Sequence, residues 1–181
     1  QYVVEGFLEG INFFSSIAGT VKKWGSSVVE WFTKGEDGKG IVEHFKEITQ
    51  NKIKGKAKAM VVTASRLHAV RYLQEFRNYI EKMGYTDMDV LVAFSGSLNI
   101  DEEEVTETKL NKTKDGRHIS EDQLPEEFHG DNFNVLIVAE KYQTGFDEPL
   151  LHTMFVDKKL KNVKAVQTLS RLNRTCSGKK D

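Results

Sequence analysis

The sequence of 181 residues has one cysteine, two prolines and no long hydrophobic run. A single cysteine, Cys176, cannot form an internal disulfide, so a reducing compartment is expected. The lack of a run of about 18 apolar residues argues against a membrane-spanning helix in this sequence. The first residues include Glu5 and Glu9 where an export signal has basic residues, so we expect a cytoplasmic protein.

The chain also lacks an excess of charge of either sign, since its net charge is −1. Any contact with nucleic acid must therefore come from a local basic patch and not from the field of the whole protein. Hydrophobic residues make up 39% and charged residues 29%, a balance typical of a globular domain with a buried core. The five histidines show no spacing typical of zinc ligands, and we interpret the acidic run 101–107 as a solvated loop, so no metal site is expected.

The N-terminal part differs in composition from the rest. Residues 1–33 are rich in aromatic residues and glycine, and residues 34–40 (KGEDGKG) contain no apolar side chain, which is typical of a linker. We expect residues 1–40 to form a helical arm with its linker, and residues 41–181 to form the main domain.

Four short apolar runs predict strands that are buried on both faces of a parallel sheet: 59–65, 89–96, 134–140 and 150–157. Between the first two, apolar residues recur at helical spacing from Ser65, a candidate cap, to Gly84. A second helix is predicted over 163–173. Residues 97–127 are polar and acidic, and we predict a surface excursion without strands that ends in a short helix near 124–128. This order predicts a doubly wound α/β domain.

Polar residues follow the strands, where ligands bind in such sheets. The strongest segment is AEKYQTGFDEP (139–149), in which Gly145 allows backbone to approach a ligand. Later in the chain, Arg171 and Arg174 lie three residues apart, a spacing that projects both guanidiniums from one helix face. Such a pair suits a polyphosphate, although it is also compatible with an ordinary solvated face that binds nearby acids.

Three segments in this order resemble the motifs of superfamily 2 helicases. KAMVVTASR (58–66) resembles motif IV, VLIVAEKYQTGFDEP (135–149) resembles motif V, and QTLSRLNR (167–174) resembles motif VI. More narrowly, residues 124–175 are similar to the motor (R) subunit of type I restriction enzymes, and the resemblance extends over about 41–181. It implies a second RecA-like domain with a parallel sheet flanked by helices. Ser170 and Asn173 stand where motif VI usually has glycine, and Thr144 stands where motif V usually has arginine. Both departures are similar to the sequences of type I motor subunits.

The resemblance implies roles for individual residues. Arg174 would be an arginine finger at the γ-phosphate, and Arg171 a second contact to phosphate or to acids that close the cleft. The remaining implied ATP-site residues are Gln167, Gly145 and Asp147. The implied contacts to the DNA backbone are Thr63, Ser65, Arg66, Ser95, Gly96 and Thr144.

The sequence has no G-x-x-x-x-G-K-[ST] loop and no acidic box after a strand. The resemblance therefore implies that ATP and Mg²⁺ are held mainly by a first RecA-like domain outside this chain, and that the chain alone does not hydrolyse ATP. Implied partners are double-stranded DNA, that first domain, and the methylase and specificity subunits, with no membrane. The parent would be a type I deoxyribonuclease and DNA translocase. Two alternatives are a free-standing nucleic-acid-binding module and a subunit-docking module, both without catalysis.

Overall fold

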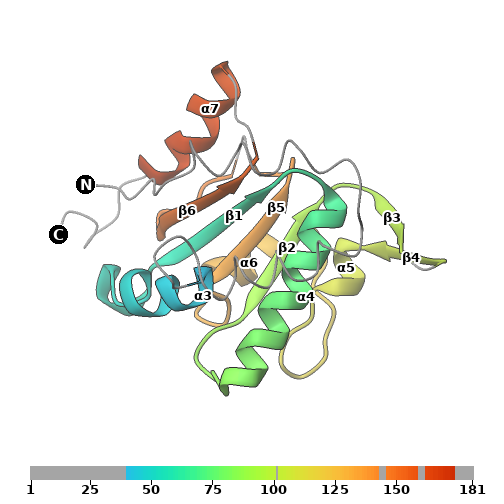
Figure 1. Ribbon diagram of the computed structural model, residues 1–181, viewed down its shortest axis with the longest axis horizontal. Coiled ribbons are helices and arrows are strands. Elements are labelled where there is room, and N and C mark those ends of the chain that lie inside the picture. Colours follow the sequence, from blue (N-terminus) through green and yellow to red (C-terminus); the bar gives the residue numbers. More distant parts are fainter. Residues whose placement is uncertain (1–39, 101, 143–145, 159–161, 174–181) are drawn as a thin grey trace.

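In the computed structural model the structure describes residues 40–100, 102–142, 146–158 and 162–173. A parallel sheet of four strands lies at the centre, in the order β2-β5-β1-β6 (Figure 1). The strands are β1 (Lys58–Thr63), β2 (Val90–Phe94), β5 (Val135–Ala139) and β6 (Leu151–Asp157). Helices cover the sheet on either side, so the predicted α/β fold of RecA-like type is confirmed.

Three of the four strands are apolar because both of their faces are covered. Every residue of β1, β2 and β5 is buried, whereas β6 at the edge has partly exposed positions. β-Branched residues dominate these strands, as expected where side chains pack on a pleated surface. The continuous hydrophobic runs that predicted the strands are thus the direct result of burial on two sides.

One face of the sheet is covered by α4 (Arg66–Met83) together with the preceding segment. Helix α4 begins at Ser65, whose Oγ accepts a hydrogen bond from the backbone N of His68 at 3.3 Å, and it ends at Gly84 with a φ of +68°. Both predicted caps are confirmed. The preceding segment comprises α3 (Ile41–His44), a π-helical turn (Phe45–Thr49) and a 3₁₀ turn (Ile53–Gly55).

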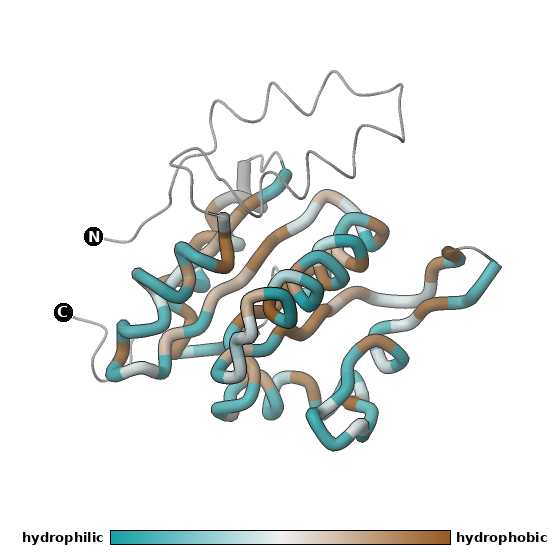
Figure 2. Tube along the Cα trace, turned by 60° about the horizontal axis from the view of Figure 1, so that its bottom comes forward, coloured by the Kyte–Doolittle hydropathy of each residue, from teal (hydrophilic) through white to brown (hydrophobic). Residues whose placement is uncertain are grey.

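The opposite face packs against a second cluster of buried residues. Its helical elements are α6 (Leu124–His129), α7 (Asn162–Leu169) and a 3₁₀ turn (Ser170–Asn173). Leu124 and Phe128 of α6 and Leu172 of the 3₁₀ turn are buried against strand residues such as Leu136. Figure 2 shows hydrophobic residues concentrated in the central strands and hydrophilic ones along the outer turns of α4. The short helix predicted near 124–128 is confirmed.

The prediction that residues 97–127 contain no strand is wrong. An antiparallel hairpin of β3 (Ser97–Ile100) and β4 (Glu103–Thr106) projects from the body, followed by α5 (Glu107–Leu110) (Figure 1). Its apolar residues Leu98, Ile100 and Val105 are only partly buried. Because these strands are four residues long and more than half of their residues are polar or charged, they lack the apolar signal that marked β1, β2 and β5.

Side chains from the α5 region close the outer edge of β2. The Oδ1 atom of Asn111 accepts a hydrogen bond from Val92 N at 3.0 Å, and its Nδ2 donates to Val92 O at 2.7 Å. Two residues further along, Glu107 Oε2 accepts from Phe94 N at 2.8 Å. Asn111 thus reproduces the hydrogen bonds of a neighbouring strand, and the edge is closed to pairing with another chain.

Candidate functional site

Motifs IV and V run past the carboxyl ends of β1 and β5 at one edge of the sheet, and motif VI lies in α7 and the 3₁₀ turn that follows it. Since β1, β2, β5 and β6 are all parallel, their carboxyl ends meet at this edge. Two surface hollows, of about 290 and 340 Å³, are lined by none of the motif residues. In parallel α/β sheets, ligands bind outside the carboxyl ends of the strands.

Motif IV begins at the end of β1 and continues into α4. Thr63 is fully buried, and its hydroxyl lies 3.1 Å from Val138 O and 3.2 Å from Ser65 O. Ser65 Oγ is also 2.6 Å from His68 Nδ1. Burial, helped by the charge of Arg71, lowers the pKa of His68 and favours its neutral form. Of the residues predicted to contact DNA here, Thr63 is turned inward, and Ser65 caps the helix.

Arg66 joins motif IV to the loop after β2. Its guanidinium Nη1 donates to Ser97 O at 2.8 Å and to Ser95 O at 3.3 Å. Gly96 lies between them with a φ of +75°, and a Cβ there would lie 3.2 Å from Arg66 Nη1. The structure therefore brings Arg66, Ser95 and Gly96 together, and all three residues are exposed at the surface. The close approach and the positive φ explain why glycine stands at this position.

The segment after β5 turns sharply. The backbone N of Lys141 donates to Ala139 O at 2.8 Å, an i to i+2 pattern that places Glu140 at the centre of a γ-turn. Glu140 has a φ of +64° and Tyr142 a φ of +61°, values that non-glycine residues adopt at a cost of about 1–3 kcal/mol each. The ring of Tyr142 packs on Phe146 with 4.7 Å between centroids. Strained backbone of this kind needs neighbouring contacts to hold it.

Motif VI contacts the end of motif V. Arg171 lies in the 3₁₀ turn after α7, and its Nη1 donates to Phe146 O at 3.1 Å. Asp147 and Gln167 are exposed. The structure therefore joins Arg171 to the loop that carries Asp147. The predicted positions Thr144, Gly145 and Arg174 lie outside the described residues.

Sequence reasoning missed a charged cluster that holds the loop after β5. The Nζ atom of Lys141 lies 2.9 Å from Glu107 Oε2 and 2.9 Å from Glu121 Oε2. Burial alone would lower the pKa of Lys141, but the hydrogen bonds to Glu121 and Glu107 outweigh it and raise the pKa. Glu107 belongs to an acidic run that we interpreted as solvated, although it is 1% exposed. The one available signal was Thr106, which caps α5 by accepting from Lys109 N.

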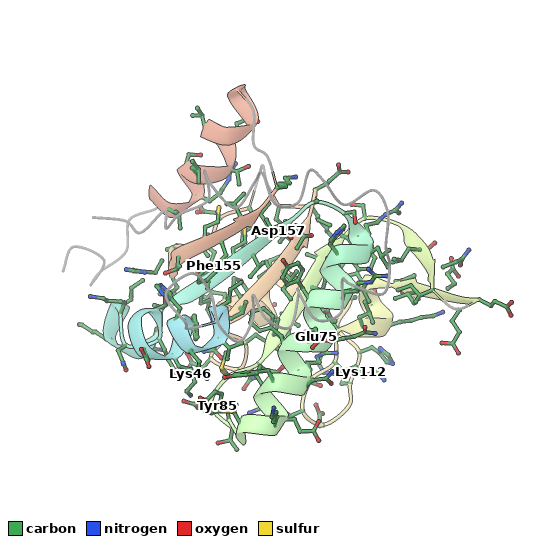
Figure 3. The ribbon with its side chains drawn as sticks, viewed as in Figure 1. Lys46, Glu75, Tyr85, Lys112, Phe155 and Asp157 are labelled. Carbon is green, nitrogen blue, oxygen red and sulfur yellow. The ribbon has the colours of Figure 1, made fainter. Side chains whose placement is uncertain are left out.

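A second missed pair lies at the end of β6. Tyr72 of α4 donates to Asp157 Oδ2 at 2.8 Å, and Figure 3 shows Asp157 at the end of its strand. Burial raises the pKa of Asp157 to about 6, although the hydrogen bond from Tyr72 opposes the shift. Burial and the nearby carboxylate raise the pKa of Tyr72 well above its usual value. Neither residue has a sequence signature, because the pair is 85 positions apart.

In the part of the chain that the structure describes, no group of three or more His, Cys, Asp or Glu side chains could hold a metal ion. Within the same part, no helix is both long and apolar enough to cross a membrane.

Comparison with known proteins gives a consistent result. Residues 117–181 match the family model described as type I restriction enzyme subunit R domain 3. Two proteins of Methanocaldococcus jannaschii, named as the MjaVIIP and MjaVIIIP type I restriction enzyme endonuclease subunits, are 35% and 31% identical to the chain. The alignments cover 75% and 80% of the chain, and 13% and 14% of those relatives. The chain thus corresponds to a small part of a much longer protein. It belongs to the family of type I restriction enzyme R subunits, which confirms the resemblance carried by its motifs.

Proposed function

We propose that this segment is the second RecA-like half of an ATP-dependent DNA translocase, within the R subunit of a type I restriction endonuclease. ATP and Mg²⁺ would be held mainly by a first RecA-like domain elsewhere in the subunit. The segment would supply cations and backbone donors across the cleft between the two domains. Its partners would be double-stranded DNA and the methylase and specificity subunits.

The observation that carries this proposal is the hydrogen bond from Arg171 to Phe146 O at 3.1 Å. It joins the motif VI region to the loop of motif V, as expected if both serve one cleft at the carboxyl edge. The family match over 117–181 supports the same assignment, because this range contains both motifs.

In this proposal Arg174 is the arginine finger. Phosphoryl transfer builds negative charge on the γ-phosphate oxygens, and a guanidinium that arrives from the second domain stabilises that charge. Arg171 would act from beside it, orienting the loop through Phe146 as well as contacting phosphate or the acids of the cleft. Gln167, Gly145 and Asp147 would border the nucleotide.

The contacts to DNA would come from the loops after β1, β2 and β5. Ser65, Arg66, Ser95, Gly96 and Thr144 offer hydroxyl, guanidinium and amide donors to phosphates, which fix position without reading sequence. The Thr63 hydroxyl points inward and donates to the backbone carbonyl of Ser65, so it supports the turn at Ser65.

The test is Arg174→Ala in the full-length R subunit, assembled in its complex, with ATP turnover measured in the presence of linear duplex DNA. We expect kcat to fall about 10³- to 10⁵-fold, while DNA binding changes little. The matched control is Arg117→Ala, which removes an exposed arginine that pairs with Glu127. ATP turnover by the isolated 181-residue chain that vanished with Arg174→Ala would contradict the proposal, since the chain should hydrolyse ATP no faster than background.

A further inference from the structure

Lys141 lies within the motif V segment and is the centre of a charged cluster whose carboxylates, Glu107 and Glu121, lie outside the three motifs. Its Nζ atom lies 2.9 and 3.1 Å from the two carboxylate oxygens of Glu107 and 2.9 Å from Glu121 Oε2. The side chain of Lys141 is 14% exposed and that of Glu107 is 1% exposed. A buried carboxylate needs such a partner, because an unpaired charge in this environment is strongly unfavourable.

Glu107 has a second bond that ties the cluster to the sheet. Its Oε2 atom accepts from Phe94 N at 2.8 Å, at the last residue of β2. Glu107 is the first residue of α5, so it belongs to the insertion between β2 and β5. One carboxylate therefore connects the insertion, the end of β2 and, through Lys141, the segment after β5.

The backbone of the segment after β5 is strained on both sides of Lys141. The residues on both sides of it, Glu140 and Tyr142, have positive φ. The far end of the same loop is held at Phe146, whose carbonyl accepts from Arg171. The loop is thus anchored at Lys141 from one side and at Phe146 from the other, and Thr144 and Gly145 lie between these anchors in the sequence.

We infer that Lys141, held by Glu107, is a positioning residue for the loop of motif V. The inference rests on the proposed function and deepens it. Lys141 lies more than two residues from Thr144 and is engaged by two carboxylates, so it acts on the site through the backbone and not by touching a ligand. The insertion 97–123 would thereby set the geometry of the cleft, a role that its acidic surface alone does not indicate.

The first test measures the anchor itself, by hydrogen exchange of the 140–147 amides in the 181-residue chain. Lys141→Met should increase exchange in this loop at least about 10-fold, because the positive-φ turn loses its support. Lys109→Met is the matched control, since Lys109 lies in α5 together with Glu107, is exposed, and its Nζ atom donates to the backbone carbonyl of Glu104. Unchanged exchange in Lys141→Met would overturn the inference.

The second test measures ATP turnover by the full-length R subunit in its assembled complex with linear duplex DNA. Lys141→Met and Glu107→Gln should each lower kcat about 10- to 100-fold and change KM for ATP much less, because a misplaced loop impairs the transition state. Glu107→Gln keeps an acceptor for Phe94 N, so it removes the charge and little else. The double variant should be no worse than the poorer single variant, because both break one interaction.

Conservative rescue separates positioning from general stability. Lys141→Arg retains the charge and should keep most of the activity, whereas Lys109→Met should match the wild type. A kcat for Lys141→Met within about 2-fold of an active wild type would overturn the inference. A wild-type complex that shows no DNA-stimulated turnover would instead contradict the proposed function, while the exchange experiment would still decide whether Lys141 anchors the loop.

Discussion

Asp157→Asn should stabilise the chain at neutral pH and much less at acidic pH. The wild-type carboxyl has a pKa of about 6 in the folded protein, against 3.8 for the ordinary value, because it is buried at the end of β6. A folded-state pKa above the unfolded value contributes stability that is fully present below pH 3.8 and is lost as the pH rises through 6. The shift of about two units corresponds to roughly 3 kcal/mol, of which about 2 kcal/mol is lost between pH 4.5 and 7.5.

Asparagine has nearly the same shape as aspartic acid, and its Oδ1 atom can still accept the hydrogen bond from Tyr72. It does not ionise, so the variant avoids the unfavourable burial of charge at pH 7.5. The difference in unfolding free energy between variant and wild type should therefore be about 1 kcal/mol at pH 4.5 and should reach about 3 kcal/mol in favour of the variant at pH 7.5. All other titrating groups are shared and cancel in this difference.

The assay is urea denaturation of the wild type and the variant at several pH values between 4.5 and 7.5. Tyr72→Phe supplies the complementary measurement, since losing a donor to a charged acceptor should cost about 1–3 kcal/mol at pH 7.5 and less at pH 4.5. A difference for Asp157→Asn that is independent of pH would refute the reasoning. A variant that is less stable than the wild type at pH 7.5 would also refute it, because the folded protein would then stabilise the ionised carboxylate of Asp157 instead of destabilising it.

Two further predictions concern buried polar groups. Asn111→Ala should leave the backbone N and O of Val92 without their partner and lower the unfolding free energy by about 1–3 kcal/mol. Because the β2 edge opens, concentration-dependent light scattering should also increase. Scattering equal to that of the wild type would contradict the argument that Asn111 closes this edge. Lys58 has a pKa lowered to about 8 by burial, so its contribution to stability is present above pH 10.5 and is lost as the pH falls through 8. Wild-type stability should thus rise between pH 8 and 10 relative to Lys58→Met, and parallel pH curves in urea denaturation would rule this out.

The sequence predicts the inner sheet well because its strands are buried on both faces. β1, β2 and β5 each form one uninterrupted apolar run, a pattern that few other structures produce. The caps of α4 were predictable for a related reason, since Ser65 and Gly84 act through local backbone geometry. The hairpin was missed because its strands are only four residues long and none of their residues is fully buried, so neither strand forms an apolar run.

The residues of the candidate site could be predicted only where they belong to a motif of contiguous residues. The motif segments point to Arg66 and Arg171, but not to the backbone carbonyls of Ser95, Ser97 and Phe146 that these side chains bind. Spacing alone placed Arg171 and Arg174 on one α-helical face, whereas α7 ends at Leu169 and a 3₁₀ turn follows. The cluster around Lys141 was invisible because its partner Glu107 is 34 positions away, and only the folded chain brings them together.

The closed edge of β2 leaves the sheet able to grow in one direction only. A fifth strand, whether from the rest of the R subunit or from another protein, cannot join beside β2 without first displacing Asn111. Along the described segments, no strand pairs with the outer side of β6. A further strand could therefore join the described sheet without that displacement only beside β6.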